Sequence, residues 1–492
     1  MSSISFQNWF ISARIATLST LICSIPFLSG CAPIPPKGIT PEIKSIDQYD
    51  TQQSFAVQKR NWPTTNWWEN YHDDQLNTLI EEGLANSPPL TVAAARLRQA
   101  QAMAGITEST LYPQISGNAN ISSQKFSRNY SMPPQFVPNG THGLASMGLD
   151  FNWELDFFGK NRASLEAALS EAEASAADFA QARLMIASSI AAEYGELAHL
   201  FYTRDTLSSI VNIRRQNQSL FNQRYSHGLD TLTTVKQAQA RLAQSEEELT
   251  AIDERIALQR NKLAALMGKG PDRGLTIKRP ALSLTADYTL PAELKMSLLG
   301  RRPDITAARL RVESMVSQIE RQKAEFYPDV NLSAFIGYQA GISKLFKSGS
   351  DYYGAGPAIT LPIFTAGRLS AQLEEVRAEY AQAVGLYNQT ITNALQEIND
   401  TLVSQRYLVE QMEKNHLSVN AAKDALRLTQ NRYKGGLTNY LEVLSAEEAL
   451  LQTLRTQADL RAKVYTLDVA MIKALGGGYE KPHTATRPIT EK

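Results

Sequence analysis

One stretch of the chain alternates between apolar and polar side chains. Apolar residues occupy every second position from Ala145 to Phe157, and polar or small residues fill the positions between them. Successive side chains of a β-strand point to opposite faces, so the pattern predicts a strand with one apolar and one polar face. After Gly159 a helical pattern begins and continues for more than sixty residues. The sequence therefore predicts a strand able to span a bilayer that leads into a very long helix.

Three further stretches alternate in the same way. They run from Ile115 to Ile121, from Val330 to Tyr338 and from Tyr353 to Ile363. A loop rich in proline, with an Asn-Gly pair, separates the first of them from the stretch that ends at Phe157. We predict two β-hairpins, over residues 114–158 and 329–364.

Long helices are predicted after each hairpin. No proline occurs between residues 139 and 270 or between 363 and 481, as uninterrupted helices require. The helix after Gly159 carries two neighbouring apolar stripes, one of them with heptad spacing, so we expect it to pack against helices on two sides. The stripes are Leu184, Ala187, Ala191, Tyr194, Ala198 and Phe201, and Ile186, Ile190, Leu197 and Leu200.

The chain contains an internal repeat. The glycine pairs 159 and 367, 228 and 436, and 268 and 476 are each separated by 208 residues, and the segments around them are alike. Each repeat supplies one hairpin and one long helix pair, at 160–268 and 368–475, preceded by shorter helices. The predicted divisions are a signal peptide (1–30), a lipidated extended linker (31–60), repeat 1 with equatorial helices (61–270), a linker (271–292), repeat 2 (293–478) and a C-terminal tail (479–492).

The N-terminus has the features of an export signal. Arg14 precedes an apolar segment that ends at Leu28, and Leu28-Ser29-Gly30-Cys31 follows. This tetrad resembles the bacterial lipobox, in which cleavage precedes the cysteine and its thiol receives diacylglycerol. The resemblance implies a covalent lipid on Cys31, and Ala32 after it favours sorting to the outer membrane. An ordinary signal peptide with a chance cysteine is the alternative.

Composition and motifs argue against several functions. The 492 residues include 49 basic and 49 acidic side chains, so we expect no nucleic-acid partner. The six histidines show no metal-ligand spacing, and Glu196-x-x-His199 matches only half of a di-iron motif. Phosphate-binding loops and Gly-x-Ser-x-Gly elbows are absent from the sequence. We therefore expect no enzyme activity, no metal site and no cofactor beyond the lipid.

Four strands cannot close a barrel, and in lipid every strand edge must be paired. The chain is therefore expected to oligomerise. Two copies would supply eight strands with a filled interior, and three would supply twelve with a lumen. The predicted helix from Arg368 to Lys434 has 67 residues, or about 100 Å at ~1.5 Å per residue. It is too long and too charged to lie in a bilayer, so we expect it to extend into water.

Several short motifs carry a family resemblance. They are Trp67-Trp68, Leu76-Asn77, Arg301-Arg302-Pro303-Asp304-Ile305, Phe364-Thr365-Ala366-Gly367-Arg368, the two Tyr-Pro pairs at which strands start and two Arg-Tyr-x-x-Gly turns. By these residues the whole chain resembles the OprM/TolC family of outer-membrane efflux proteins, in its lipoprotein branch. The resemblance implies a homotrimer with a twelve-stranded transmembrane β-barrel, four strands from each chain, continued by a periplasmic α-helical barrel. It also implies a passive exit duct that works with a periplasmic adaptor and an inner-membrane RND transporter in a Gram-negative cell.

The resemblance also implies where the functional residues lie. In the family the two helix-turn-helix tips form the periplasmic mouth. The corresponding aperture residues are Thr438, Asn439, Tyr440 and Asp230. The corresponding adaptor contacts are Arg224, Tyr225, Gly228, Arg432, Tyr433 and Gly436. A plain helix cap with no gating role is the alternative for each tip residue.

Two other functions remain open at this point. The same duct could serve a type I system that secretes polypeptides, although the lipobox and Arg301-Arg302-Pro303-Asp304 favour small-molecule efflux. A neighbouring gene for an RND transporter would decide between them. The chain could instead be a lipid-anchored coiled-coil scaffold without a pore, which would give neither conductance in planar bilayers nor a trimer in mild detergent.

Overall fold

The computed structural model describes residues 34–36, 38, 41–51, 53–55, 58–127, 129, 133–282, 290–291 and 300–480. The predicted signal peptide, Cys31 and residues 481–492 lie outside them. The chain forms two compact units: unit 1 comprises residues 1–42, 99–172 and 310–385, and unit 2 comprises residues 43–98, 173–309 and 386–492. Each unit therefore takes segments from both sequence repeats.

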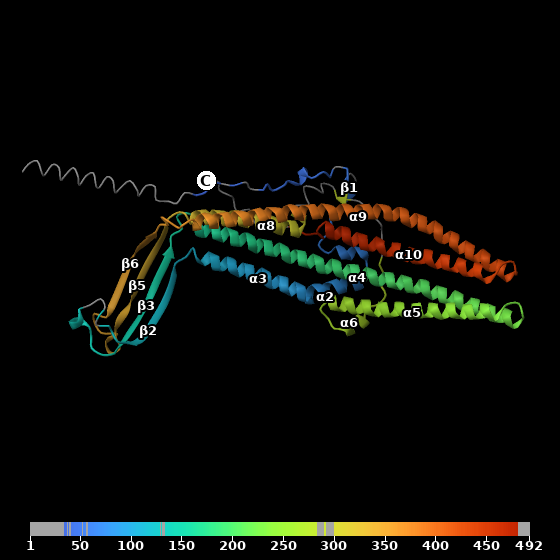
Figure 1. Cartoon of the computed structure of the whole chain (residues 1–492), viewed down its shortest axis with the longest axis horizontal. Helices are drawn as coiled ribbons and strands as arrows, with labels where there is room; N and C mark the ends of the chain where they lie inside the picture. The colour runs from blue at the N-terminus through green and yellow to red at the C-terminus, as the bar shows by residue number, and fades with distance from the viewer. Residues whose placement is uncertain are drawn as a thin grey trace, which may run out of the picture. The chain divides into compact units, whose positions relative to one another are not determined.

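Unit 1 contains a four-stranded antiparallel sheet (Figure 1). Its strands are β2 (Gln114–Gln124), β3 (His142–Glu154), β5 (Asp329–Gly341) and β6 (Asp351–Thr360), in the order β2-β3-β5-β6. The four predicted strands are confirmed. Strands β2 and β6 form the two edges of this sheet, and each pairs with one neighbour within the chain.

Strand β3 is shorter than predicted. It ends at Glu154, before Phe157, because the next residues cap the helix that follows. The carboxylate of Asp156 accepts hydrogen bonds from the backbone N–H groups of Asn161, at 3.2 Å, and Arg162, at 2.9 Å. A residue whose side chain caps the start of a helix cannot stay in the register of the preceding strand. The alternation of apolar and polar residues therefore runs on past the end of the strand.

The register of the sheet separates an apolar face from a polar face. Phe151 lies opposite Ile115 on β2 and Ala334 on β5, whereas Asp150 lies opposite Ser116 and Phe335. Side chains on the apolar face are open to the surroundings of the single chain. They include Ile115, Ile121, Leu149, Ile336, Tyr353 and Ile359, exposed by 54 to 77%.

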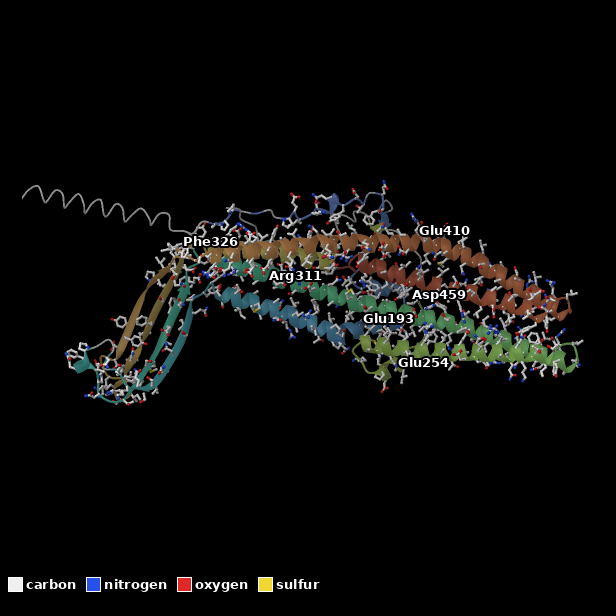
Figure 2. All side chains as sticks on the ribbon, in the orientation of Figure 1. Glu193, Glu254, Arg311, Phe326, Glu410 and Asp459 are labelled. Atoms are coloured by element: carbon white, nitrogen blue, oxygen red, sulfur yellow. The ribbon has the colours of Figure 1, made fainter. Side chains whose placement is uncertain are left out.

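Four helices have segments in both units. They are α3 (Pro88–Ser109), α4 (Lys160–Ser226), α8 (Pro303–Ala324) and α9 (Arg368–Lys434). Two contacts join three of these helices in unit 1. Phe326, which follows α8 and is labelled in Figure 2, is buried with Leu369 and Leu373 of α9. The hydroxyl of Ser314 on α8 donates a hydrogen bond of 2.9 Å to the carbonyl of Ala167 on α4.

Unit 2 is a helical assembly of α2 (Asp74–Asn86), α5 (Leu232–Leu266) and α10 (Tyr440–Ala474) with parts of α4 and α9 (Figure 1). The predicted apolar stripes of α4 enter its core, in which Ile190, Tyr194 and Leu197 are fully buried beside Trp67 and Leu76. Helices α4 and α9 have 67 residues each, and the predicted span of α9 is confirmed. None of the described helices combines the length and apolarity needed to cross a bilayer.

The repeat is visible in the backbone. The three glycine pairs that are 208 residues apart all have positive φ angles. Gly228 and Gly436 have φ of 72° and 74°, and each follows one of the long helices. This left-handed conformation ends both helices in the same way, because glycine adopts it without steric cost.

The predicted linker at 271–292 is more structured than expected. Helix α6 (Pro271–Leu275) lies within it, and β4 (Leu290–Pro291) pairs in parallel with β1 (Gln58–Arg60). The short helix η2 (Trp67–Tyr71) was also missed. These elements depend on partners far away in sequence or on very short turns, neither of which leaves a periodic pattern.

Candidate functional site

Two helix-turn-helix tips, α4–α5 and α9–α10, contain the residues predicted to form the mouth. Their turns have the same hydrogen bonds: Leu229 N–H donates to the Arg224 carbonyl at 2.8 Å, and Leu437 N–H donates to the Arg432 carbonyl at 2.9 Å. Thr231 and Asn439 then cap the following helices through their side-chain oxygens. Both tips are therefore built by the same local signals, a glycine after one helix and a capping residue before the next.

A polar cluster joins the two tips. The Tyr433 hydroxyl on α9 donates a hydrogen bond to Asp230 in the first tip. Arg224 forms a salt bridge of 3.1 Å with the same carboxylate, and its guanidinium lies 4.9 Å from the centre of the Tyr433 ring. Burial, followed by the hydrogen bond to Asp230, raises the pKa of Tyr433, so its hydroxyl remains a donor at physiological pH. We call these three residues the tip latch, since they connect repeat 1 to repeat 2.

Aromatic rings form the core behind the latch. Phe221 of α4 contacts the rings of Tyr433 and Tyr440 edge-on, with centroid distances of 5.4 and 4.6 Å. Phe221, Tyr433 and Tyr440 are all buried, together with Val443 and Leu450. Within the single chain, Tyr433 and Tyr440 are therefore part of the apolar core behind the tips.

The other predicted tip residues lie on the surface. Tyr225, Gly228, Arg432, Gly436 and Asn439 are exposed, and Thr438 is partly exposed. The sequence comparison of the repeats treated Tyr225 and Tyr433 as equivalent, but the structure exposes 44% of the former and buries the latter. The predicted roles at an aperture and an adaptor contact remain predictions.

Exposed leucines at the tips were missed by the sequence reasoning. Leu229 and Leu437 follow the two turn glycines and are exposed by 64 and 73%. An apolar residue at the same place in both repeats, directly after the glycine, was the available signal. Both leucines therefore lie in water in the single chain.

A second polar cluster lies two helical turns from Tyr440. Glu447 of α10 is buried, accepts a hydrogen bond from the Asn217 side chain and lies 4.0 Å from Arg214 of α4. Arg214 in turn donates to the Ser245 hydroxyl of α5 at 2.5 Å. Burial raises the pKa of Glu447 to about 7, against the attraction of Arg214. The protonation state of this carboxyl therefore changes close to neutral pH.

His199 of the half di-iron motif forms polar contacts between helices. His199 of α4 contacts Glu196 at 3.3 Å and Asp459 of α10 at 2.8 Å, so it connects the two repeats; Asp459 is labelled in Figure 2. Hydrogen bonds to Glu196 and Asp459 raise the pKa of His199. Throughout the described part of the chain, no three His, Cys, Asp or Glu side chains gather closely enough to hold a metal ion.

Comparison with known proteins decides the family. A family model described as outer membrane efflux protein matches residues 79–269 and 294–477, which is more than half of the chain. The chain belongs to this family. The two matched ranges fall in the two sequence repeats, so the family match follows the internal repeat of the chain.

Similar proteins agree over most of the length. The multidrug resistance outer membrane protein MdtQ of Escherichia coli O157:H7 is 33% identical over 474 residues, covering 92% of this chain and 96% of the relative. The fusaric acid resistance protein FusA of Burkholderia cepacia is 34% identical, covering 74% of this chain and 70% of the relative. The crystal structure of the outer membrane protein VceC from Vibrio cholerae has a TM-score of 0.80 and 45% identity, covering 85% of this chain and all of that one.

These matches establish the general function. The efflux protein is an outer-membrane channel of a Gram-negative bacterium and not an enzyme. Its family consists of trimeric outer-membrane channels that work in tripartite pumps.

Proposed function

We propose that three copies of this chain form the passive exit duct of a tripartite RND-type pump that exports small molecules. The sheet of unit 1 carries this proposal. It has an exposed apolar face and two edges, β2 and β6, that find no second neighbour among the described strands. Open edges and unpaired backbone groups are not tolerated in lipid. Pairing β6 of each copy with β2 of the next closes a barrel of twelve strands.

The tips are the proposed contact with the periplasmic adaptor. Leu229, Leu437 and Tyr225 are exposed there, and Arg432 adds a charge beside them. A partner that covers the leucines would remove apolar surface from water, at about 25 cal/mol for each Å² buried. The inner-membrane transporter supplies the energy, since a passive duct has none of its own.

The tip latch is proposed to hold the mouth closed. Tyr433 and Asp230 come from different helix pairs, so the two pairs cannot separate without breaking their hydrogen bond. Thr438 and Asn439 lie at the second turn and would line the closed mouth. An adaptor that pulls the pairs apart would open it.

Lipid on Cys31 is proposed to anchor the duct. Arg377 of α9 donates hydrogen bonds of 3.0 and 2.9 Å to the carbonyls of Pro35 and Pro36. Arg377 lies nine residues into α9, about 14 Å from its start at ~1.5 Å per residue. Cys31 precedes Pro35 by four residues. An extended chain of that length, at ~3.3–3.6 Å per residue, can span about the same distance back toward the start of α9. The acyl chain can therefore reach the level of the strand-to-helix junction, where the membrane surface is expected.

Small molecules are the proposed cargo because the similar proteins are named for resistance to drugs and to fusaric acid. The test deletes the gene in its host and measures retention of a fluorescent dye and the set of secreted polypeptides. We expect the deletion to raise dye retention and leave the secreted polypeptides unchanged. The wild-type gene should restore efflux. Unchanged dye retention together with a missing secreted polypeptide would contradict the proposal and favour the secretion system.

A further inference from the structure

We propose that the polar face of the sheet holds a subsite for organic cations that carry an aromatic ring. The subsite consists of Asp150, Phe335 and Tyr352. The proposal rests on the trimeric barrel of the preceding section, in which this face lines the lumen. It adds a place along the duct where cargo of one chemical class is retained briefly.

The orientation of the three side chains follows from the register. Only the apolar face, with Leu149 and Ile336, can meet lipid, so the opposite face must line the lumen. Asp150 and Phe335 are directly opposed on β3 and β5, and Tyr352 lies on β6 two residues from the partner of Phe335. All three therefore belong to the same small area of the lumen face.

Glycines give the two rings space to lie on the sheet. A Cβ placed on Gly354 would be 2.7 Å from the Phe335 ring, and one on Gly337 would be 3.1 Å from the Tyr352 ring. Each ring therefore covers the backbone of a glycine with one side. The ring centroids are 5.5 Å apart with planes inclined at 36°, so together they form an aromatic floor. Phe335 is 44% exposed on a face where most of the other residues are polar or small.

The charge beside this floor is negative. Asp150 accepts a hydrogen bond from the neutral Asn118 amide. The sequences of the four strands contain no lysine or arginine. Lys160, just beyond β3, is engaged by Glu154 at 2.5 Å and Asp329 at 2.9 Å. The carboxylate is therefore not neutralised by a basic side chain of the described strands.

This combination selects by two independent features. The carboxylate attracts cations and repels anions, and low-dielectric walls concentrate its field in the lumen. The exposed ring faces attract a cation and stack with an aromatic ring of the cargo. Contact with a solvent-filled lumen keeps each attraction weak, as passage requires. A cation with an aromatic ring is attracted by the carboxylate and by the ring faces and also stacks on the rings, whereas a simple ammonium ion cannot stack.

The test measures local electrostatics with a reporter thiol. Ser333→Cys lies on the lumen face, diagonal to Asp150, and the chain has only Cys23 and Cys31 besides. Intact cells are treated with a cationic or an anionic methanethiosulfonate, and the two rates are compared. We expect the cation-to-anion rate ratio to fall about tenfold at low ionic strength when Asp150→Asn is added. Asp150→Glu should restore it. If Asp150→Asn leaves the cation-to-anion rate ratio at Ser333→Cys unchanged, the charge assignment is overturned.

The aromatic part is tested by protection of the same thiol. Because only its phenyl ring can stack on the aromatic floor, we expect phenyltrimethylammonium to slow modification at roughly threefold lower concentration than tetramethylammonium. Phe335→Leu should abolish the difference without changing the cation-to-anion ratio. Equal protection by both cations in the wild-type background would refute the aromatic floor.

Two controls separate this proposal from that of the barrel. Each variant is first examined as an unheated, detergent-resistant trimer. Absence of the trimer in the wild-type background refutes the trimeric duct itself. Ala334→Cys places the thiol on the lipid face, and we expect it to react far more slowly than Ser333→Cys. A trimer in which Ala334→Cys reacts faster would reverse the two faces and refute the subsite alone.

Discussion

Removal of one hydroxyl group should open the tip. Tyr433→Phe keeps the ring against Phe221 and under the Arg224 guanidinium but removes the hydrogen bond to Asp230. A hydrogen bond to a charged group contributes about 1.5–3 kcal/mol. Asp230 keeps its salt bridge to Arg224, so it is not left without a partner and the lower part of this range applies. At ~1.4 kcal/mol per factor of ten, the ratio of open to closed tips should rise about tenfold or more.

The repeat supplies a matched control for this change. Tyr225 occupies the equivalent position in the sequence of the first repeat but is 44% exposed and takes no part in the latch. Tyr225→Phe removes the same atom without loosening the latch. Both variants are reconstituted as trimers in planar bilayers, and the open probability is recorded at fixed salt and voltage. Equal open probability in Tyr433→Phe and wild type, or an equal rise in both variants, would refute the latch.

Three further predictions concern pH, the helix junction and the barrel. Between pH 4.5 and about 7 folded chains keep a proton on Glu447 that unfolded chains have lost, so thermal stability should fall as pH rises through this range. Glu447→Gln should make that slope shallower, and a slope unchanged in this variant would contradict the assignment. Arg302 is buried and bonds to Asp304 at 2.6 and 3.0 Å, whereas the Asp304 carboxylate is partly exposed and can be hydrated when its partner is lost. Arg302→Met should therefore lower the free energy of unfolding in a denaturant titration by about 1.5–3 kcal/mol, and an unchanged value would contradict this role. Gly337→Ala places a Cβ 2.3 Å from a backbone carbonyl oxygen and should reduce the yield of heat-modifiable trimer. The control Gly356→Ala has open space around its Cβ and should leave the yield unchanged. Equal yields of the two variants would contradict the close approach of β3 and β5 at Gly337.

Periodic and local features could be predicted from the sequence. Strands with two distinct faces, helices free of proline and turns built on glycine each follow from residues close together in the chain. The span of α9 and the positive φ angles of Gly228 and Gly436 are examples. The internal repeat made these predictions stronger because each half could be compared with the other.

Contacts between distant residues could not be predicted in the same way. The latch joins Asp230 to Tyr433, and the buried pair joins Arg214 to Glu447. Neither pair leaves a pattern in the sequence, because each depends on how helices of one repeat pack against those of the other. The repeat even suggested a false equivalence, since Tyr225 and Tyr433 differ in burial. The pairing of β1 with β4 was missed for the same reason.

We expect the four-stranded sheet of each chain to be one third of a closed barrel. The most direct test is native mass spectrometry of the protein released from outer membranes in a mild detergent. We expect a complex of three chains that persists without heating. A stable single chain released from the outer membrane would contradict it.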